Sequence, residues 1–172
     1  MSLYEKFGKL KDLKVGIIGD ISHSRVALSN VYGLTTMGAE VTLCGPPNLI
    51  PPYIKDLGVN IDYNIDQVIE WADALNVLRI QRERMGIGLV PSIREYRSMF
   101  GLTAERLKHH KKEIVIMHPG PMNRGVEIDG VVADGDQAII LDQVLNGVAS
   151  RMAILYLLFS GKYGEEGENE TK

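Results

Sequence analysis

Three short segments carry side chains suited to binding a small dicarboxylate that also bears an amino group. Arg25 closes the segment 19–25, and Arg79 and Gln81 flank one residue in the run Arg79-Ile80-Gln81. A guanidinium donates two parallel hydrogen bonds to a carboxylate, so two arginines would hold the two acidic groups of such a ligand. The i, i+2 spacing on an extended segment places Arg79 and Gln81 on the same side. Gln81 would add a neutral donor or acceptor beside the charge.

The third segment, His118-Pro119-Gly120-Pro121, follows an apolar run. Its two prolines fix φ and remove two backbone donors, so the carbonyls there lack local partners and can face a ligand. The carbonyl groups of Gly120 and Pro121 could therefore accept hydrogen bonds from an ammonium group. The same residue types also suit a turn that only redirects the chain, and the sequence leaves both interpretations open.

All three segments follow apolar runs that predict buried parallel strands, at residues 15–19, 74–78 and 114–117. In open α/β sheets, small molecules bind at the carboxyl ends of the strands. Arg25 also lies in the first turn of a predicted helix over 24–37, where the helix dipole favours an anion. We therefore expect the three segments to form one ligand site.

Strands and helices alternate along the whole chain, which predicts an α/β fold with a doubly wound, mostly parallel, five-stranded, Rossmann-like sheet. The predicted strands are residues 15–19, 40–44, 59–63, 74–78 and 114–117, and the predicted helices between them are 24–37, 52–57 and 65–72. The segment 82–102 breaks the rhythm. Its glycines and a helical turn near 92–99 predict a long mobile loop of the kind that serves function.

The last predicted element is a helix over about 137–160. From Met152 to Phe159 it is apolar on nearly every side, so it needs cover from more than one direction. The chain thus divides into an α/β domain over 1–137, an apolar C-terminal helix over 138–161, and a Glu- and Gly-rich tail over 162–172 that we expect to be disordered.

Composition excludes several classes of protein. A hydrophobic content of 45%, a charged content of 24% and a net charge of -3 indicate a soluble globular domain with no nucleic-acid or membrane partner. The apolar run 152–159 is far shorter than a membrane span, and the first residues lack the apolar core of a signal peptide. The single Cys44 excludes an internal disulfide and indicates a cytoplasmic protein. We expect Cys44 to be a buried structural thiol.

Several of these polar residues also have ordinary structural interpretations. Exposed arginines usually form weak surface pairs, which is what we expect of Arg82 and is the alternative for Arg25 and Arg79. His23 and His118 could transfer protons or cap a loop, and we expect His118 to anchor its loop.

No cofactor or metal is expected. The G-x-G-x-x-G fingerprint of dinucleotide binding is absent, and Asp20 after the first strand would repel a pyrophosphate. The four histidines lack metal-ligand spacing.

Taken together, the motifs resemble the aspartate-binding half of the catalytic chain of aspartate carbamoyltransferase. The resemblance is carried by residues 15–25, Arg79-Ile80-Gln81-Arg82-Glu83-Arg84, Met117-His118-Pro119-Gly120-Pro121-Met122-Asn123-Arg124 and the helical run 146–153. It extends from about Tyr4 to Lys162. Ornithine carbamoyltransferases would be expected to have His-Cys-Leu-Pro at 118–121 and to lack the Arg-x-Gln pattern, so aspartate is favoured.

This resemblance implies transfer of a carbamoyl group from carbamoyl phosphate to the amino group of L-aspartate, in pyrimidine biosynthesis. It also implies that Arg25 binds one carboxylate, and that Arg79 and Gln81 bind the other. The backbone at Gly120 and Pro121 would meet the amine or the carbamoyl group, and the loop that follows Gln81 would close on the substrate.

The chain departs from the family in two respects. Gly120 stands where the family usually has Leu, which would loosen the loop. The family's Ser-Thr-Arg-Thr loop and His-Pro-x-x-Gln motif, which belong to a preceding carbamoyl-phosphate domain, do not occur in this sequence. We therefore expect no catalytic group within the chain and no activity of the chain alone, since carbamoyl phosphate would be reached only through that domain.

The resemblance further implies that the apolar last helix packs on the absent domain, and that the full enzyme is a homo-oligomer, a trimer in this family, which can also carry a regulatory chain. Without that cover we expect self-association through the helix. The alternatives are a stand-alone amino-acid-binding or regulatory module and a fragment of an ornithine-type carbamoyltransferase.

Overall fold

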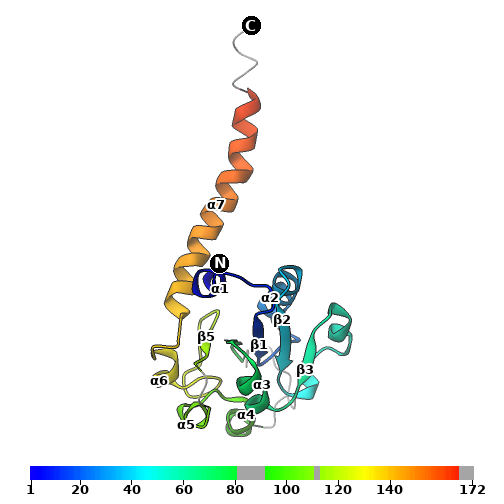
Figure 1. Ribbon diagram of the computed structural model, residues 1–172, viewed down its shortest axis with the longest axis vertical. Coiled ribbons are helices and arrows are strands. Elements are labelled where there is room, and N and C mark those ends of the chain that lie inside the picture. Colours follow the sequence, from blue (N-terminus) through cyan, green and yellow to red (C-terminus); the bar gives the residue numbers. More distant parts are fainter. Residues whose placement is uncertain (81–91, 111–112, 167–172) are drawn as a thin grey trace.

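The computed structural model describes residues 1–80, 92–110 and 113–166, and it contains one five-stranded sheet in which every strand pair is parallel. The strands are β1 (Lys14–Ile18), β2 (Glu40–Cys44), β3 (Asn60–Asp62), β4 (Ala74–Val77) and β5 (Val115–Met117), in the order β3-β2-β1-β4-β5 (Figure 1). The predicted fold class is confirmed. β1 lies at the centre of the sheet, between β2 and β4.

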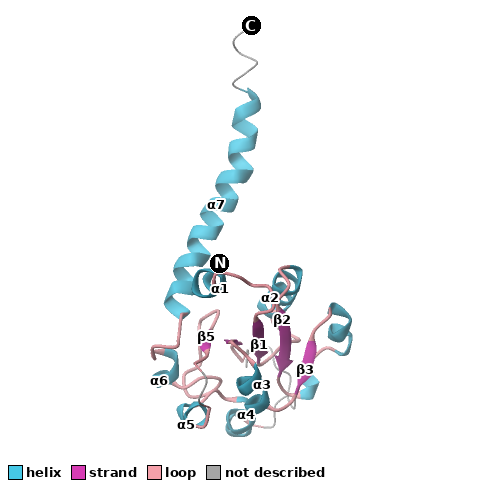
Figure 2. Ribbon diagram, viewed as in Figure 1, coloured by secondary structure: helices cyan, strands magenta, loops and turns pink. Residues whose placement is uncertain are grey.

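Helices cover both faces of the sheet, as Figure 2 shows. The helices of the described chain are α1 (Ser2–Phe7), α2 (Arg25–Thr36), α3 (Ile65–Trp71), α4 (Ile93–Phe100), α5 (Ala104–Lys108), α6 (Gly130–Ala133) and α7 (Ile140–Glu166), with two 3-10 turns, η1 (Pro47–Leu49) and η2 (Pro52–Leu57). Consecutive strand residues alternate between two cores: Ile17 packs in a cluster with α1 and α2, and Ile18 in a cluster with α3 and α4. This alternation follows from the two-residue period of a strand.

Polar side chains fix where four of the helices begin. Ser24, Asn64, Ser92 and Thr103 each accept a hydrogen bond from a backbone N–H in the first turn of α2, α3, α4 and α5, at 2.9–3.1 Å. Such caps satisfy donors that have no partner inside the helix. Of the two serines shortly before α2, Ser22 and Ser24, it is Ser24 that caps the helix.

The predicted element boundaries differ from the observed ones by a few residues. The run 52–57 is a 3-10 helix, and the short elements η1 and α6 were not predicted. The last helix was predicted over about 137–160, whereas α7 begins at Ile140 and ends at Glu166. Helical structure therefore reaches into the first part of the segment 162–172 that was expected to be a tail. Residues 167–172 lie outside the described part of the chain.

Helix α7 projects away from the rest of the molecule (Figure 1). Only its first turns contact the body, where Nδ2 of Asn146 donates to Oγ of Ser2 at 3.1 Å and also bonds Glu5. Its large apolar side chains from Leu141 to Phe159 are 53–83% exposed. An unpartnered apolar helix of this length requires cover.

Length and composition alone would also let the 21 residues of α7 from Ile140 to Ser160 span a bilayer, since their mean hydropathy is 1.2. The apolar run 152–159, the only one considered in the sequence, is shorter than this helical segment. However, the segment carries Asp142 and Arg151, and charged side chains are costly within a bilayer.

Candidate functional site

The carboxyl ends of three neighbouring strands define the candidate site. Ile18 of β1 is the register partner of Val77 of β4, and Asn76 of β4 is the partner of Met117 of β5. Because all strands run in the same direction, the segments that follow them leave the same edge of the sheet side by side. This is the edge at which open α/β folds bind ligands.

The segment after β1 is organised by a buried carboxylate. Asp20 is 1% exposed, accepts a hydrogen bond from the backbone N–H of His23 at 3.1 Å and pairs with Nδ1 of that residue at 2.9 Å. His23 therefore serves as a loop-capping partner in this structure. The cap of Ser24 follows directly, and Arg25 is the first residue of α2, exposed to solvent. The hydrogen bonds of Asp20 to His23 thus fix the backbone just before α2, the helix that begins at Arg25.

The segment after β4 continues the sheet for one more residue before it departs. The backbone N–H of Leu78 donates to the carbonyl of Ile18 at 2.7 Å, which holds the chain in an extended path up to Arg79. Arg79 is half-buried, and Ile80 beyond it is buried. Gln81, predicted to share the same side as Arg79, lies outside the described residues, as do Arg82 and the following residues through 91.

The segment after β5 is anchored by His118, as the sequence predicted. His118 is fully buried, its Nδ1 accepts from the backbone N–H of Gly120 at 2.9 Å, and its own N–H donates to Oε1 of Gln143 at 3.2 Å. Gly120 has φ +61, a left-handed conformation that favours glycine over the Leu usual in the resembled family, and a cis peptide bond joins it to Pro121.

Gly120 and Pro121 are both exposed. Among the described residues, no hydrogen bond ends on the carbonyl oxygens of Gly120 or Pro121. Within the described part of the chain, nothing therefore occupies either carbonyl, and their role toward a ligand stays a prediction.

Two polar residues that the sequence did not single out complete this edge. The side chain of Glu127 is fully buried and accepts from the backbone N–H of Asn123 at 2.5 Å and from its Nδ2 at 3.2 Å. The same Nδ2 donates to the carbonyl of Ile80 at 3.1 Å. In the sequence, the only sign of these contacts was that two polar residues, Asn123 and Glu127, follow the His-Pro-Gly-Pro turn. Their partner Ile80 is remote in sequence.

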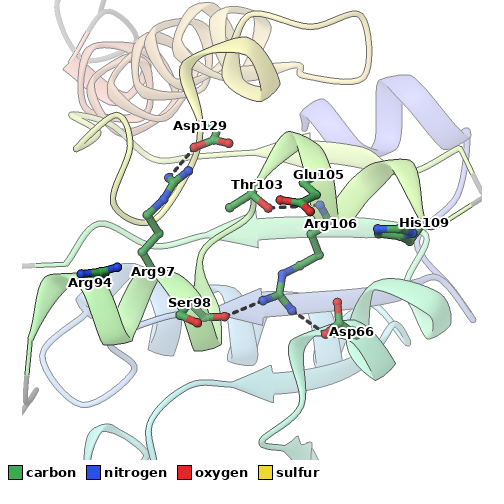
Figure 3. A pocket seen from close by; sticks show the side chains of 9 residues that line it. All are labelled: Asp66, Arg94, Arg97, Ser98, Thr103, Glu105, Arg106, His109 and Asp129. Carbon is green, nitrogen blue, oxygen red and sulfur yellow. Dashed lines mark hydrogen bonds and ion pairs between the residues drawn. The ribbon is translucent and has the colours of Figure 1, made fainter.

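A cavity of about 520 Å³ lies elsewhere in the described structure, between α3, α4, α5 and Asp129 (Figure 3). All of the residues that line it are polar or charged, and none of the candidate site residues is among them. Two of its three arginines are already paired: Arg97 binds Asp129, and Arg106 binds Asp66 at 2.6 Å. We interpret this cavity as a region of cross-linking ion pairs and not as the ligand site.

Metal and thiol chemistry find no support in the described part of the chain. No group of three or more His, Cys, Asp or Glu side chains is gathered there as a metal site would need. Cys44 is buried, and burial, reinforced by Asp62, raises the pKa of its thiol to about 12. A thiol of this kind is structural, as expected.

Comparison with known proteins identifies the family. Residues 11–158 match the model of the aspartate/ornithine carbamoyltransferase, Asp/Orn binding domain, and the chain belongs to this family. The resemblance drawn from the sequence motifs is thereby confirmed.

The curated relatives are aspartate carbamoyltransferase catalytic subunits. That of Moorella thermoacetica is 58% identical over 93% of this chain and 52% of its own length, and that of Gemmatimonas aurantiaca is 54% identical over 94% and 51%. The chain therefore spans about half the length of the curated relatives it matches.

Solved structures from both branches of the family share the fold. The catalytic subunit of M. jannaschii aspartate transcarbamoylase superposes with a TM-score of 0.74 at 29% identity, over 99% of this chain and 54% of that one. Ornithine carbamoyltransferase from Pyrococcus furiosus gives 0.75 at 25% identity, over 91% and 52%.

Proposed function

We propose that this chain is the aspartate-binding half of an aspartate carbamoyltransferase, the enzyme that converts carbamoyl phosphate and L-aspartate to N-carbamoyl-L-aspartate and phosphate in pyrimidine biosynthesis. The observation that carries the proposal is the identity of 52–58% with aspartate carbamoyltransferase catalytic subunits over nearly the whole chain. The geometry adds support, because Arg25 and Arg79 both follow adjacent strands at one edge of the sheet.

In this proposal the ligand lies across the ends of β1, β4 and β5. Arg25 binds one carboxylate of aspartate, and Arg79 together with Gln81 binds the other through charge-assisted hydrogen bonds. The carbonyls of Gly120 and Pro121 accept from the amino group or meet the carbamoyl group. In these roles, the guanidiniums and the carbonyls would act from the same edge of the sheet.

The chain alone is proposed to bind aspartate without turning it over. The sequence has no Ser-Thr-Arg-Thr loop and no His-Pro-x-x-Gln motif to stabilise the leaving phosphate. A transition state that develops charge without preorganised donors keeps a high barrier. Carbamoyl phosphate would therefore be bound and activated by the other half of the enzyme.

The exposed apolar surface of α7 fits the same proposal. Its side chains from Leu141 to Phe159 would pack on the carbamoyl-phosphate half, in a cytoplasmic homo-oligomer without a membrane or nucleic-acid partner. The helix would thus form a unit distinct from the α/β domain over 1–137. Cover from a globular partner suits a helix that is apolar on several sides.

Calorimetric titration of the chain with L-aspartate, succinate and L-ornithine tests the proposal. We expect binding of aspartate and of succinate, which has the same two carboxylates, and no binding of ornithine. A preference for ornithine would assign the chain to the ornithine carbamoyltransferases instead. Carbamoyl aspartate formed after addition of a separately produced carbamoyl-phosphate domain would distinguish a half-enzyme from a stand-alone binding module, which would stay inactive in a well-folded mixture.

A further inference from the structure

We propose that Asn123 and Glu127 are positioning residues that fix the distance between the two loops of the ligand site, an inference that rests on the proposed function. Asn123 connects the loop after β5 to the segment after β4, because its Nδ2 donates to the carbonyl of Ile80 at 3.1 Å. Ile80 directly follows Arg79. The bond therefore links the guanidinium that would hold a carboxylate to the loop whose carbonyls would hold the amino group.

Glu127 holds Asn123 in place for this contact. Its carboxylate accepts both from the Asn123 backbone N–H at 2.5 Å and from the Asn123 side chain at 3.2 Å. On its other side, Oε1 of Glu127 lies 3.4 Å from Nε2 of His118, without the geometry of a hydrogen bond. His118 in turn fixes the backbone of Gly120. Glu127 is thus in contact with both ends of the loop that carries Gly120 and Pro121.

The fold does not require this carboxylate to hold the loop. The backbone of residues 123–129 is already held by hydrogen bonds from Gly125 to Ile128, from Leu102 to Glu127 and from Asp129 to Leu102, at 2.8–3.1 Å. The Ile128 side chain is fully buried beside them. A fully buried carboxylate costs free energy unless it is well hydrogen-bonded. An acidic side chain at 127 is therefore better explained by the geometry it imposes on Asn123 and His118 than by stability.

The arrangement predicts which part of the ligand is affected when the connection is lost. Arg79 is held by the extension of β4, since the Leu78 N–H bonds the Ile18 carbonyl, so its grip on a carboxylate does not depend on Asn123. The position of the Gly120 and Pro121 carbonyls relative to Arg79 does depend on it. Loss of Asn123 should therefore weaken recognition of the amino group and leave recognition of the carboxylates.

The test is the titration of Asn123→Ala with L-aspartate and with succinate, which lacks the amino group. We expect the Kd for aspartate to rise about five- to tenfold, as loss of one or two hydrogen bonds predicts, and the Kd for succinate to change by less than about twofold. Glu127→Gln, which is isosteric but turns a donor toward Asn123, should show the same selective loss. Asn30→Ala, which removes an Asn-to-carbonyl bond of 2.8 Å within α2, is the matched control and should change neither Kd.

A general loss of structure would weaken both ligands together, so equal effects on aspartate and succinate would overturn the positioning role. Wild-type affinity in both variants would overturn it as well, with the proposed function intact. A wild-type chain that binds neither ligand would instead remove the proposed function, and the positioning role with it.

Discussion

Ile18 of β1 and Val77 of β4 are register partners, so the two segments that lead to Arg25 and Arg79 leave the sheet at the same level. If both guanidiniums bind one diacid, removal of either should weaken succinate binding by about 10- to 100-fold, since a charged hydrogen-bonded contact is worth about 1.5–3 kcal/mol. Titration of Arg25→Gln and Arg79→Gln measures this. Arg94→Gln, which removes an exposed arginine of α4, is the control and should bind as the wild type does. Unchanged affinity in Arg79→Gln would contradict the assignment.

Alanine at two glycines, Gly45 directly after β2 and Gly33 within α2, should change stability in opposite directions. A Cβ at Gly45 would lie 2.3 Å from the carbonyl oxygen of Gly19, so Gly45→Ala must displace the backbone where the β1 loop starts. We expect a loss of about 1–3 kcal/mol, typical of overpacking. A Cβ at Gly33 of α2 meets nothing within 4 Å, so Gly33→Ala should stabilise the helix by about 0.5–1 kcal/mol. Urea unfolding monitored by circular dichroism compares the two, and a Gly45→Ala variant as stable as the wild type would refute the close approach.

The ion pair between Arg97 and Asp129 predicts a stability loss in acid. Burial opposes ionisation of Asp129, but hydrogen bonds from Arg97 and from the Ala104 N–H outweigh it and lower the pKa of this carboxyl below its ordinary value of 3.8. A carboxyl with a lowered folded-state pKa contributes stability that is present above its unfolded pKa and is lost as pH falls through the folded one. The unfolding temperature, measured from pH 6 to pH 2, should therefore fall less steeply below about pH 4 in Asp129→Asn than in the wild type. Parallel curves for the two proteins would show that the pair does not contribute.

The thiol of Cys44 should be inert in the native protein. With its pKa raised to about 12 by burial, very little thiolate exists near neutral pH, and the thiolate is the reactive form. An aromatic disulfide reagent at pH 8 should label Cys44 only slowly in the folded chain and completely in denaturant. Rapid labelling without denaturant would place this thiol at a solvent-accessible site.

Helix α7 should drive self-association without contributing to the stability of the α/β domain. Leu155 is 54% exposed, and Leu75 in β4 is fully buried. We expect Leu155→Ala to change the unfolding free energy by less than about 0.5 kcal/mol, and Leu75→Ala to cost about 2–5 kcal/mol. In sedimentation the wild type should form oligomers that are reduced by Leu155→Gln combined with Phe159→Gln. A clean monomer at high concentration would contradict the expectation that the exposed apolar side chains of α7 associate with another surface.

The strands and most helices could be predicted because their signals are local. Short, mainly apolar runs marked β1, β2 and β4, and the helix predicted over 24–37 corresponds to α2. The one-turn elements η1 and α6 carry too few residues for a periodic signal. α7 was predicted as a helix, but its contact with α1 through Asn146 depends on a partner at the opposite end of the chain.

The candidate site was predictable to the same extent. Arg25, Arg79, Gly120 and Pro121 were selected because they lie in the segments that follow strands, and their roles stay predictions, whereas His118 was correctly identified as the anchor of its loop. Asp20 was noted only as a charge unfavourable to pyrophosphate, and Glu127 was missed, because a buried carboxylate is recognised only by the donors around it. For Glu127 those donors come from Asn123, which also bonds Ile80 in another loop.

The central claim is that Arg25 and Arg79 hold the two carboxylates of one diacid across neighbouring strand ends. A crystal structure of the chain with succinate tests it most directly. The account predicts one guanidinium within hydrogen-bond distance of each carboxylate, with the carbonyls of Gly120 and Pro121 beside the bound ligand. Succinate bound instead among Arg94, Arg97 and Arg106, or Arg25 and Arg79 directed to separate surfaces, would contradict it.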